Sequence, residues 1–206
     1  REMAKVVQSG GALALFPEAT RTWTGETNNF DISIVKLIRL LKVPIITAVM
    51  RGSYFFDPRW GKKIRKSAMH IEFKMAFKPE DLKHLTDEQI FETLKRNLYH
   101  NDIAYQRQRL AEIESDTRAE NIEFICYQCP ACLQYDGFNS SGNDFECRSC
   151  ANTFTVDNFG FIASKTDFVL PFDNTFDWLN WQGNNFAQLV KSQLIKAEKG
   201  ALFTSE

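Results

Sequence analysis

All five cysteines of this 206-residue chain lie in one short window, between positions 126 and 150. Cys129 and Cys132 form one Cys-x-x-Cys pair, and Cys147 and Cys150 form a second pair after an interval of fourteen residues. Two tight turns at this spacing offer four thiolates in the arrangement that tetrahedral zinc requires. We therefore predict that these four cysteines hold a structural zinc ion in a small β zinc ribbon, with no open coordination position.

Disulfide bonds, an iron–sulfur site and a redox dithiol are the alternative uses of such cysteines. The sequence carries no secretory signal, so we expect a cytoplasmic protein with reduced thiols rather than disulfides. A redox dithiol needs only one of the two pairs, whereas the spacing itself leaves iron–sulfur ligation open. Cys126 is the surplus cysteine, and we expect it to be a core or spare thiol.

A second group of reactive side chains follows an apolar run near the start of the chain. Residues 12–16 are apolar throughout, Pro17 ends the run, and Glu18, Thr20 and Arg21 follow it. We expect a buried strand over 12–16 that delivers these polar side chains to its carboxyl end, where open α/β sheets bind ligands. The Arg21 guanidinium suits a phosphate group, and Glu18 can orient it or accept from a substrate hydroxyl. The alternative is an exposed ion pair of little energetic weight.

Two segments resemble one enzyme family. Residues 16–21, Phe-Pro-Glu-Ala-Thr-Arg, resemble the Phe-Pro-Glu-Gly-Thr-Arg block of the glycerol-phosphate and lysophosphatidate acyltransferases, with Ala19 in place of the usual glycine. Residues 43–49, Val-Pro-Ile-Ile-Thr-Ala-Val, resemble the family's later Val-Pro-Ile-Ile-Pro-Val strand, from which Thr47 and Ala48 depart. The resemblance covers about residues 1–110.

The resemblance implies an enzyme of phospholipid biosynthesis on a peripheral membrane surface. Such an enzyme moves a fatty acyl group from acyl-CoA or acyl carrier protein to lysophosphatidate (1-acylglycerol 3-phosphate) or to glycerol 3-phosphate. The implied acceptor site comprises Glu18, Ala19, Thr20 and Arg21 around the phosphate, and Val43, Pro44 and Ile45 as its wall. If the turn requires a positive φ at Ala19, that residue is strained where glycine would not be.

Acyl transfer to a hydroxyl also needs a general base, and the family uses a histidine with an aspartate five positions later. His70, His84 and His100 are followed at that distance by methionine, glutamine and tyrosine, and all three come after the phosphate block. We expect them to be ordinary surface or core histidines. The base block is then upstream of residue 1, and this chain is predicted to be inactive alone.

The elements that position the acceptor site follow from the apolar periodicity. We expect a helix over 2–8, then the strand over 12–16. A helix capped by Asn29 or Asp31 and a strand from residue 44 to 50 complete a parallel, right-handed βαβ unit. This order predicts a layered α/β domain.

The rest of the chain predicts further modules. Residues 68–77 alternate in polarity as a half-buried strand does, and helix is expected from Thr86 through about Ser115. A helix over 185–199 is predicted after an aromatic cluster, which we expect to close a small core with the ribbon and which comprises Phe168, Phe172, Phe176, Trp178 and Trp181. The predicted fold class is α/β: a partial acyltransferase-type layered domain over 1–118, a zinc ribbon over 119–165 and a helical tail over 166–206.

The chain has a net charge of −1, but its basic and acidic residues are concentrated in different segments. Residues 36–66 carry nine lysines and arginines against one acid, Asp57, and such a segment can attract anionic lipid or an acidic carrier protein. Residues 112–177 carry twelve acids against three basic residues.

No apolar run approaches the length of a transmembrane helix. The rival function is a non-catalytic module, in which the zinc ribbon docks protein or nucleic acid and the upstream half is scaffold.

Overall fold

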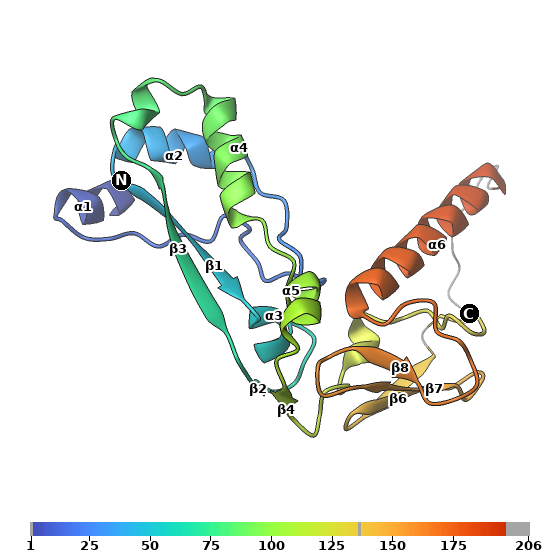
Figure 1. The fold of residues 1–206 in the computed structure, drawn as a ribbon. Coiled ribbons are helices and arrows are strands. Elements are labelled where there is room, and N and C mark those ends of the chain that lie inside the picture. The colour runs from blue at the N-terminus through green and yellow to red at the C-terminus, as the bar shows by residue number, and fades with distance from the viewer. Residues whose placement is uncertain (1, 136, 197–206) are drawn as a thin grey trace. The chain divides into compact units, whose positions relative to one another are not determined.

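The computed structural model describes residues 2–135 and 137–196 and has a mixed α/β architecture (Figure 1). Its internal contacts divide the chain into two compact units. Unit 1 comprises Arg1–Arg59 and Ser67–Leu110, and unit 2 comprises Trp60–Lys66 and Ala111–Glu206. The finer division at residues 118 and 165 stays a prediction.

Unit 1 is built around one antiparallel pair of strands, β1 (Ile45–Arg51) and β3 (His70–Phe77). Its helices are α1 (Glu2–Gln8), α2 (Ile34–Leu41), α3 (Ser53–Phe56), the 3-10 helix η1 (Asp81–Lys83), α4 (Asp87–Leu98) and α5 (Asp102–Arg109). The core lies where α2 and α4 meet the sheet, and it contains the buried side chains of Val35, Ile38, Phe77, Leu82, Ile90 and Leu94.

The predicted helices of unit 1 are present, but two of them have different limits. The helix expected to be capped by Asn29 or Asp31 is α2, which begins at Ile34 with Ser33 at its N-cap position. The helix expected from Thr86 to Ser115 is two helices, because Asn101 starts a second one by accepting the Ala104 N–H at 2.9 Å. α5 then ends at Leu110, whose φ of 49° is left-handed. The start of α4 was predicted correctly, since Thr86 forms a reciprocal capping box with Gln89.

The predicted parallel βαβ unit is not formed, because residues 12–16 are not a strand. Phe16 is 75% exposed. Within the described residues, β1 belongs to a two-stranded sheet with the antiparallel strand β3. An apolar run becomes a buried strand only when neighbours cover it and pair with its backbone, and a local pattern does not supply those neighbours.

The strand predicted over 68–77 is confirmed as β3, but only Phe77 at its end is buried, and Ile71, Phe73 and Met75 are exposed. Phe73 is 70% exposed, and it shares one face of the sheet with the alternate residues of both strands. On the opposite face Thr47 is buried, and α4 contacts both strands. We call the exposed set the β1–β3 apolar face; it comprises Ile46, Met50, Ile71, Phe73 and Met75.

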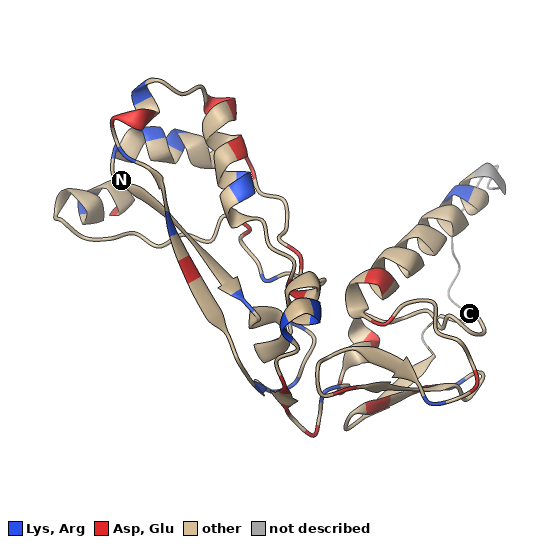
Figure 2. Cartoon of the chain, in the orientation of Figure 1, with Lys and Arg blue, Asp and Glu red and all other residues tan. Residues whose placement is uncertain are grey.

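Some of the positive charge between residues 36 and 66 is balanced within unit 1. The Arg39 Nε donates to the Asp87 carboxylate at 2.5 Å, and the Arg51 Nη2 donates to Glu72 at 2.6 Å. Basic residues on α2 and acidic residues on α4 are visible in Figure 2. These arginines therefore add no unbalanced positive charge to the unit.

Unit 2 contains a four-stranded antiparallel sheet in the order β5-β6-β7-β8. Its strands are β5 (Phe138–Ser141), β6 (Asp144–Cys147), β7 (Thr153–Val156) and β8 (Ile162–Ser164). Gly142 and Asn143 form the hairpin turn between β5 and β6, with Ser141 opposite Asp144. A 3-10 helix, η2, spans Ile122–Phe124, and β4 (Ile113–Glu114) is a two-residue strand, as is β2 (Lys66–Ser67) at the boundary between the units.

The C-terminal helix α6 (Thr175–Lys196) begins ten residues earlier than the predicted helix, whose last three positions lie outside the described residues. Asn174 caps it by accepting the Asp177 N–H at 2.9 Å. Trp178 is therefore a helical residue, and it is fully buried against the rings of Phe138, Phe145 and Phe154. The predicted aromatic core is confirmed for Phe168, Phe172, Trp178 and Trp181.

None of the helices in residues 2–135 and 137–196 combines the length and the hydrophobicity needed to cross a membrane.

Candidate functional site

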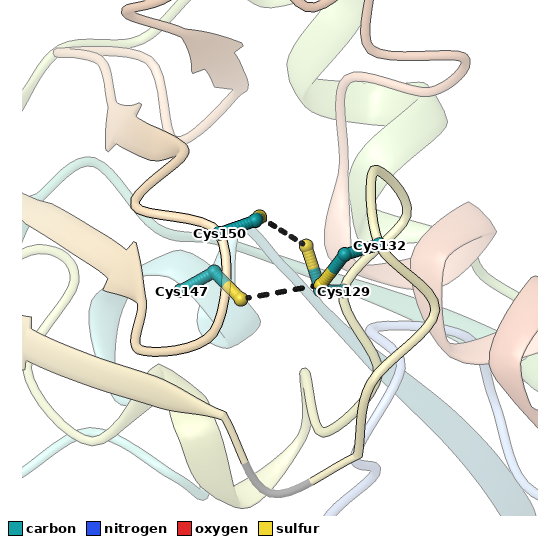
Figure 3. Close-up of side chains that lie close together, drawn as sticks. All are labelled: Cys129, Cys132, Cys147 and Cys150. Atoms are coloured by element: carbon teal, nitrogen blue, oxygen red, sulfur yellow. Dashed lines mark hydrogen bonds between the residues drawn. The ribbon is translucent and has the colours of Figure 1, made fainter.

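The four predicted zinc ligands lie together in unit 2, and their sulfur atoms point toward one another (Figure 3). The Sγ atoms of Cys129 and Cys150 are 3.8 Å apart, and those of Cys132 and Cys147 are 3.6 Å apart. All four Sγ atoms lie within 4.8 Å of one another. The two Cys-x-x-Cys turns therefore meet as the spacing predicted.

These separations fit a single metal ion at the centre. A zinc–sulfur bond of about 2.3 Å in a regular tetrahedron places the sulfur atoms about 3.8 Å apart. A disulfide requires about 2.05 Å, and all five cysteines are free thiols. Four thiolates complete a tetrahedral shell, so the cluster can hold an ion such as zinc in a structural role.

The two Cys-x-x-Cys turns repeat the same backbone geometry. The residue after the second cysteine of each pair is left-handed, with φ of 63° at Leu133 and 57° at Ala151. Each donates its N–H to the carbonyl oxygen of the first cysteine at 2.8 Å, Leu133 to Cys129 and Ala151 to Cys147. This closed turn holds the two sulfur atoms of a pair on the same side of the chain.

Burial and neighbouring hydrogen-bond donors shift the pKa values of the thiols. Burial disfavours the Cys150 thiolate, but hydrogen bonds led by that of the Asn152 side chain bring its pKa down to about 7. The Asn152 Nδ2 lies 3.2 Å from the Cys150 Sγ. Burial raises the pKa of Cys129, although the backbone N–H groups of Cys132 and Ala131 oppose it. A bound cation supplies the positive charge that buried thiolates need.

Helix α6 fixes the backbone that leads into the first cysteine pair. The side-chain oxygen of Gln182 accepts the N–H groups of Tyr127 and Gln128 at 3.0 and 3.2 Å. Its amide nitrogen donates to the carbonyl of Ile125. Gln182 is 0% exposed. No motif in the sequence marked this residue; a glutamine on the same helical face as Trp178 is the signal that points to it.

Cys126 lies outside the four-cysteine cluster, as predicted for a core thiol. It is fully buried in the apolar core of unit 2. Burial, with a smaller contribution from the charge of Glu123, raises its pKa well above the ordinary value. This thiol therefore stays protonated and is a packing group.

The polar turn expected to bind phosphate lies in unit 1. Pro17 takes the second position of a β-turn in which the Ala19 N–H donates to the Phe16 carbonyl at 3.0 Å. Ala19 has a φ of 58°, so the position where the resembled family has glycine is left-handed here. Thr20 and Arg21 follow on the exposed side of this turn.

Glu18 and Arg21 do not pair with each other. The Glu18 carboxylate accepts the backbone N–H of Asn28, and burial raises its pKa despite that hydrogen bond. Arg21 pairs with the Asp57 carboxylate, and its Nη1 also donates to the Asp57 carbonyl at 3.2 Å. Glu18 therefore fixes the loop, while Asp57, a partner that no sequence pattern indicated, orients the arginine.

The predicted wall residues lie at the opposite end of β1. Val43 and Pro44 precede the strand, and Ile45 begins it and packs against the core between α2 and α4. Arg21 instead contacts the segment after α3, on the carboxyl side of β1. The role of residues 43–45 as a wall stays a prediction.

A histidine–aspartate pair is present, with Asp102 buried and His100 largely covered, but it is not a free base. The His100 Nε2 lies 2.6 Å from the Asp102 Oδ1, and its Nδ1 lies 3.1 Å from the Arg51 Nη1. Arg51 can only donate, so it occupies the lone pair that a base would use. Asp102 also accepts the N–H groups of Gly52 and Tyr54 and so caps α3. The expected structural role of His100 fits this geometry.

Comparison with known proteins gives no relative. No family model matches the chain, and neither does any curated protein or solved structure. The functional argument therefore depends on the side chains described above.

Proposed function

We propose that this chain carries the acceptor-binding part of a phospholipid-biosynthesis acyltransferase, together with a structural zinc ribbon. The enzyme would work at the membrane surface, where it transfers a fatty acyl group from acyl-CoA or acyl carrier protein to lysophosphatidate or glycerol 3-phosphate. The observation that carries the proposal is the exposed Arg21 at the end of a left-handed turn whose Glu18 is turned inward.

The turn supplies binding and orientation rather than proton transfer. A guanidinium presents a rigid fork of N–H donors that matches phosphate oxygens. When the acceptor hydroxyl attacks the thioester carbon, the carbon–sulfur bond breaks and the hydroxyl proton must pass to a base. His100 is engaged on both ring nitrogens, so we assign the base to residues outside these 206.

The proposal is tested by acyl transfer to 1-acylglycerol 3-phosphate. The intact gene product should transfer the acyl group, and the 206-residue chain should not. Arg21→Ala in the intact product should raise KM for the phosphorylated acceptor by about tenfold or more, the loss expected for charge-assisted hydrogen bonds. Lys36→Ala, which removes an exposed positive charge from α2, is the matched control. Activity of neither chain would reject the proposal.

A docking role for unit 2 is the second candidate. Phe124 and Leu133, which flank the first cysteine pair, are 68% and 57% exposed. Exposed apolar side chains beside a rigid metal site favour a protein partner over nucleic acid, as does the acidic composition of residues 112–177. Loss of a copurifying protein on Phe124→Ser, with acyl transfer absent from the wild type, would favour this candidate.

A further inference from the structure

Two arginines connect the polar turn to the segment after α3, and each donates a hydrogen bond to the backbone of the other segment. Arg21 donates to the main-chain carbonyl of Asp57 at 3.2 Å, and the Arg59 Nη1 donates to the main-chain carbonyl of Arg21 at 3.1 Å. Each guanidinium is thus held at the backbone of the other segment. The resemblance to acyltransferases assigns no role to Arg59, and it is the fold that brings this second guanidinium to the backbone of Arg21.

Trp23 holds the second guanidinium in a fixed orientation. The Arg59 Cζ lies 4.2 Å from the centroid of the Trp23 ring, which is a cation–π arrangement. Stacking uses the face of the guanidinium, and the bond to Arg21 uses one of its five N–H groups. An arginine held in this way loses little side-chain entropy when its remaining edge meets an anion.

The charged side chains of these two segments have a net positive charge, as an anion-binding site requires. Arg21 and Arg59 contribute two positive charges, and Asp57 supplies one carboxylate, which pairs with Arg21. A phosphate monoester carries close to two negative charges at neutral pH and accepts from two guanidinium forks. The carboxylate of Asp57 therefore occupies, on Arg21, a position that phosphate oxygens would take.

We propose that Arg21 and Arg59 together form a two-arginine site for a phosphate monoester, in which Asp57 competes with the ligand for Arg21. This inference rests on the proposed function, and it adds Arg59 as a binding residue and Asp57 as a residue that sets affinity. It also gives the ligand class: a dianionic monoester binds in preference to a monoanionic diester. The two side chains have opposite effects, since Arg59 strengthens phosphate binding and Asp57 weakens it.

The test is equilibrium binding of glycerol 3-phosphate to the 206-residue chain, measured by titration calorimetry without any acyl donor. Arg59→Gln should weaken binding by about tenfold, as expected for the loss of charge-assisted hydrogen bonds. Asp57→Asn should tighten binding several-fold, because the amide keeps the shape but not the competing charge. Lys36→Gln, with the same charge loss as Arg59→Gln, should change binding less than about twofold.

Three results would overturn the site: no binding by the wild type, wild-type affinity in Arg59→Gln, or weaker binding in Asp57→Asn. If Arg59→Gln fails to fold, Arg59→Lys keeps the charge without the planar fork and should still weaken binding. Acyl transfer by the intact protein with no effect of Arg59→Gln would reject the site and leave the proposed function standing. The expected binding pattern without acyl transfer would reject the proposed function and leave the site standing.

Discussion

The indole Nε1 of Trp178 donates a hydrogen bond of 3.1 Å to the main-chain carbonyl of Gln128, the residue before the first cysteine of the four-cysteine cluster. Gln182, one helical turn later, binds the backbone just before that carbonyl, at Ile125, Tyr127 and Gln128. A helix that the sequence places some fifty residues away therefore sets the position of Cys129. Such supporting contacts determine how well a metal site is preorganised.

Gln182→Leu should destabilise unit 2 and weaken metal binding. The substitution keeps the side-chain volume but leaves two N–H groups and one carbonyl without a partner in the core, which costs about 2–4 kcal/mol. Zinc affinity should fall about tenfold, as for other residues that support ligands. Urea unfolding and competition with a chelator check both effects. Gln188→Leu, on the exposed side of α6, is the control, and an equal loss there would contradict the argument.

Removal of one ligand should remove the metal. Cys147→Ser should purify with less than one zinc per chain and lose the fold of unit 2, because the ion contributes to folding directly. Cys126→Ala should keep one zinc per chain, since that thiol lies outside the cluster. Elemental analysis with circular dichroism measures both. Full metal content in Cys147→Ser would show that the four sulfurs do not form the site.

The left-handed backbone at Ala19 predicts whether two substitutions there stabilise or destabilise unit 1. Ala19→Gly should stabilise unit 1 by roughly 0.5–1 kcal/mol, because glycine adopts the left-handed φ without strain and loses part of that gain to chain entropy. Ala19→Val should destabilise it by more than about 1 kcal/mol, because a branched Cβ fits this region poorly. Denaturant midpoints give both values. A stabilising valine would mean that the turn is not left-handed.

The stability of unit 1 should fall with rising pH as Glu18 ionises. Burial raises its pKa above the ordinary 4.5, so the folded chain binds this proton more tightly than the unfolded chain. The protonated Glu18 therefore contributes its full stabilisation below pH 4.5, and this stabilisation is lost as the pH rises through the pKa of Glu18 in the folded chain. Glu18→Gln should therefore be more stable than the wild type at pH 7, with a smaller difference near pH 4.

The backbone amide of Asn28 is a direct probe of that titration. It donates to Glu18, so its nitrogen chemical shift should follow the ionisation of the carboxyl group with a midpoint above 4.5. The shift should disappear in Glu18→Gln. A midpoint below 4.5 would reverse the predicted order of stabilities.

Local patterns predicted local geometry well. The cysteine spacing located the four-cysteine cluster, and the helix expected from Thr86 begins there as α4. Each of these depends on residues a few positions apart. The sequence also indicated the aromatic core of unit 2, since many rings in one tail have few other places to be buried.

Features that depend on distant partners were not predictable in the same way. The run 12–16 has the composition of a strand, yet a strand needs a neighbour, and β1 pairs with β3 instead. The pairing of Arg21 with Asp57 joins residues 36 positions apart, and His100 meets Arg51 across 49 positions. No spacing rule connects such residues, so their partners came from the fold alone.

The β1–β3 apolar face has a thermodynamic consequence. Ile46, Phe73 and Met75 are at least half exposed on one side of the sheet, and water must hydrate them. Hydration of apolar surface carries a large positive heat capacity. Any molecule that covers this face will therefore bind with a negative change in heat capacity, and its binding enthalpy will become more favourable as the temperature rises.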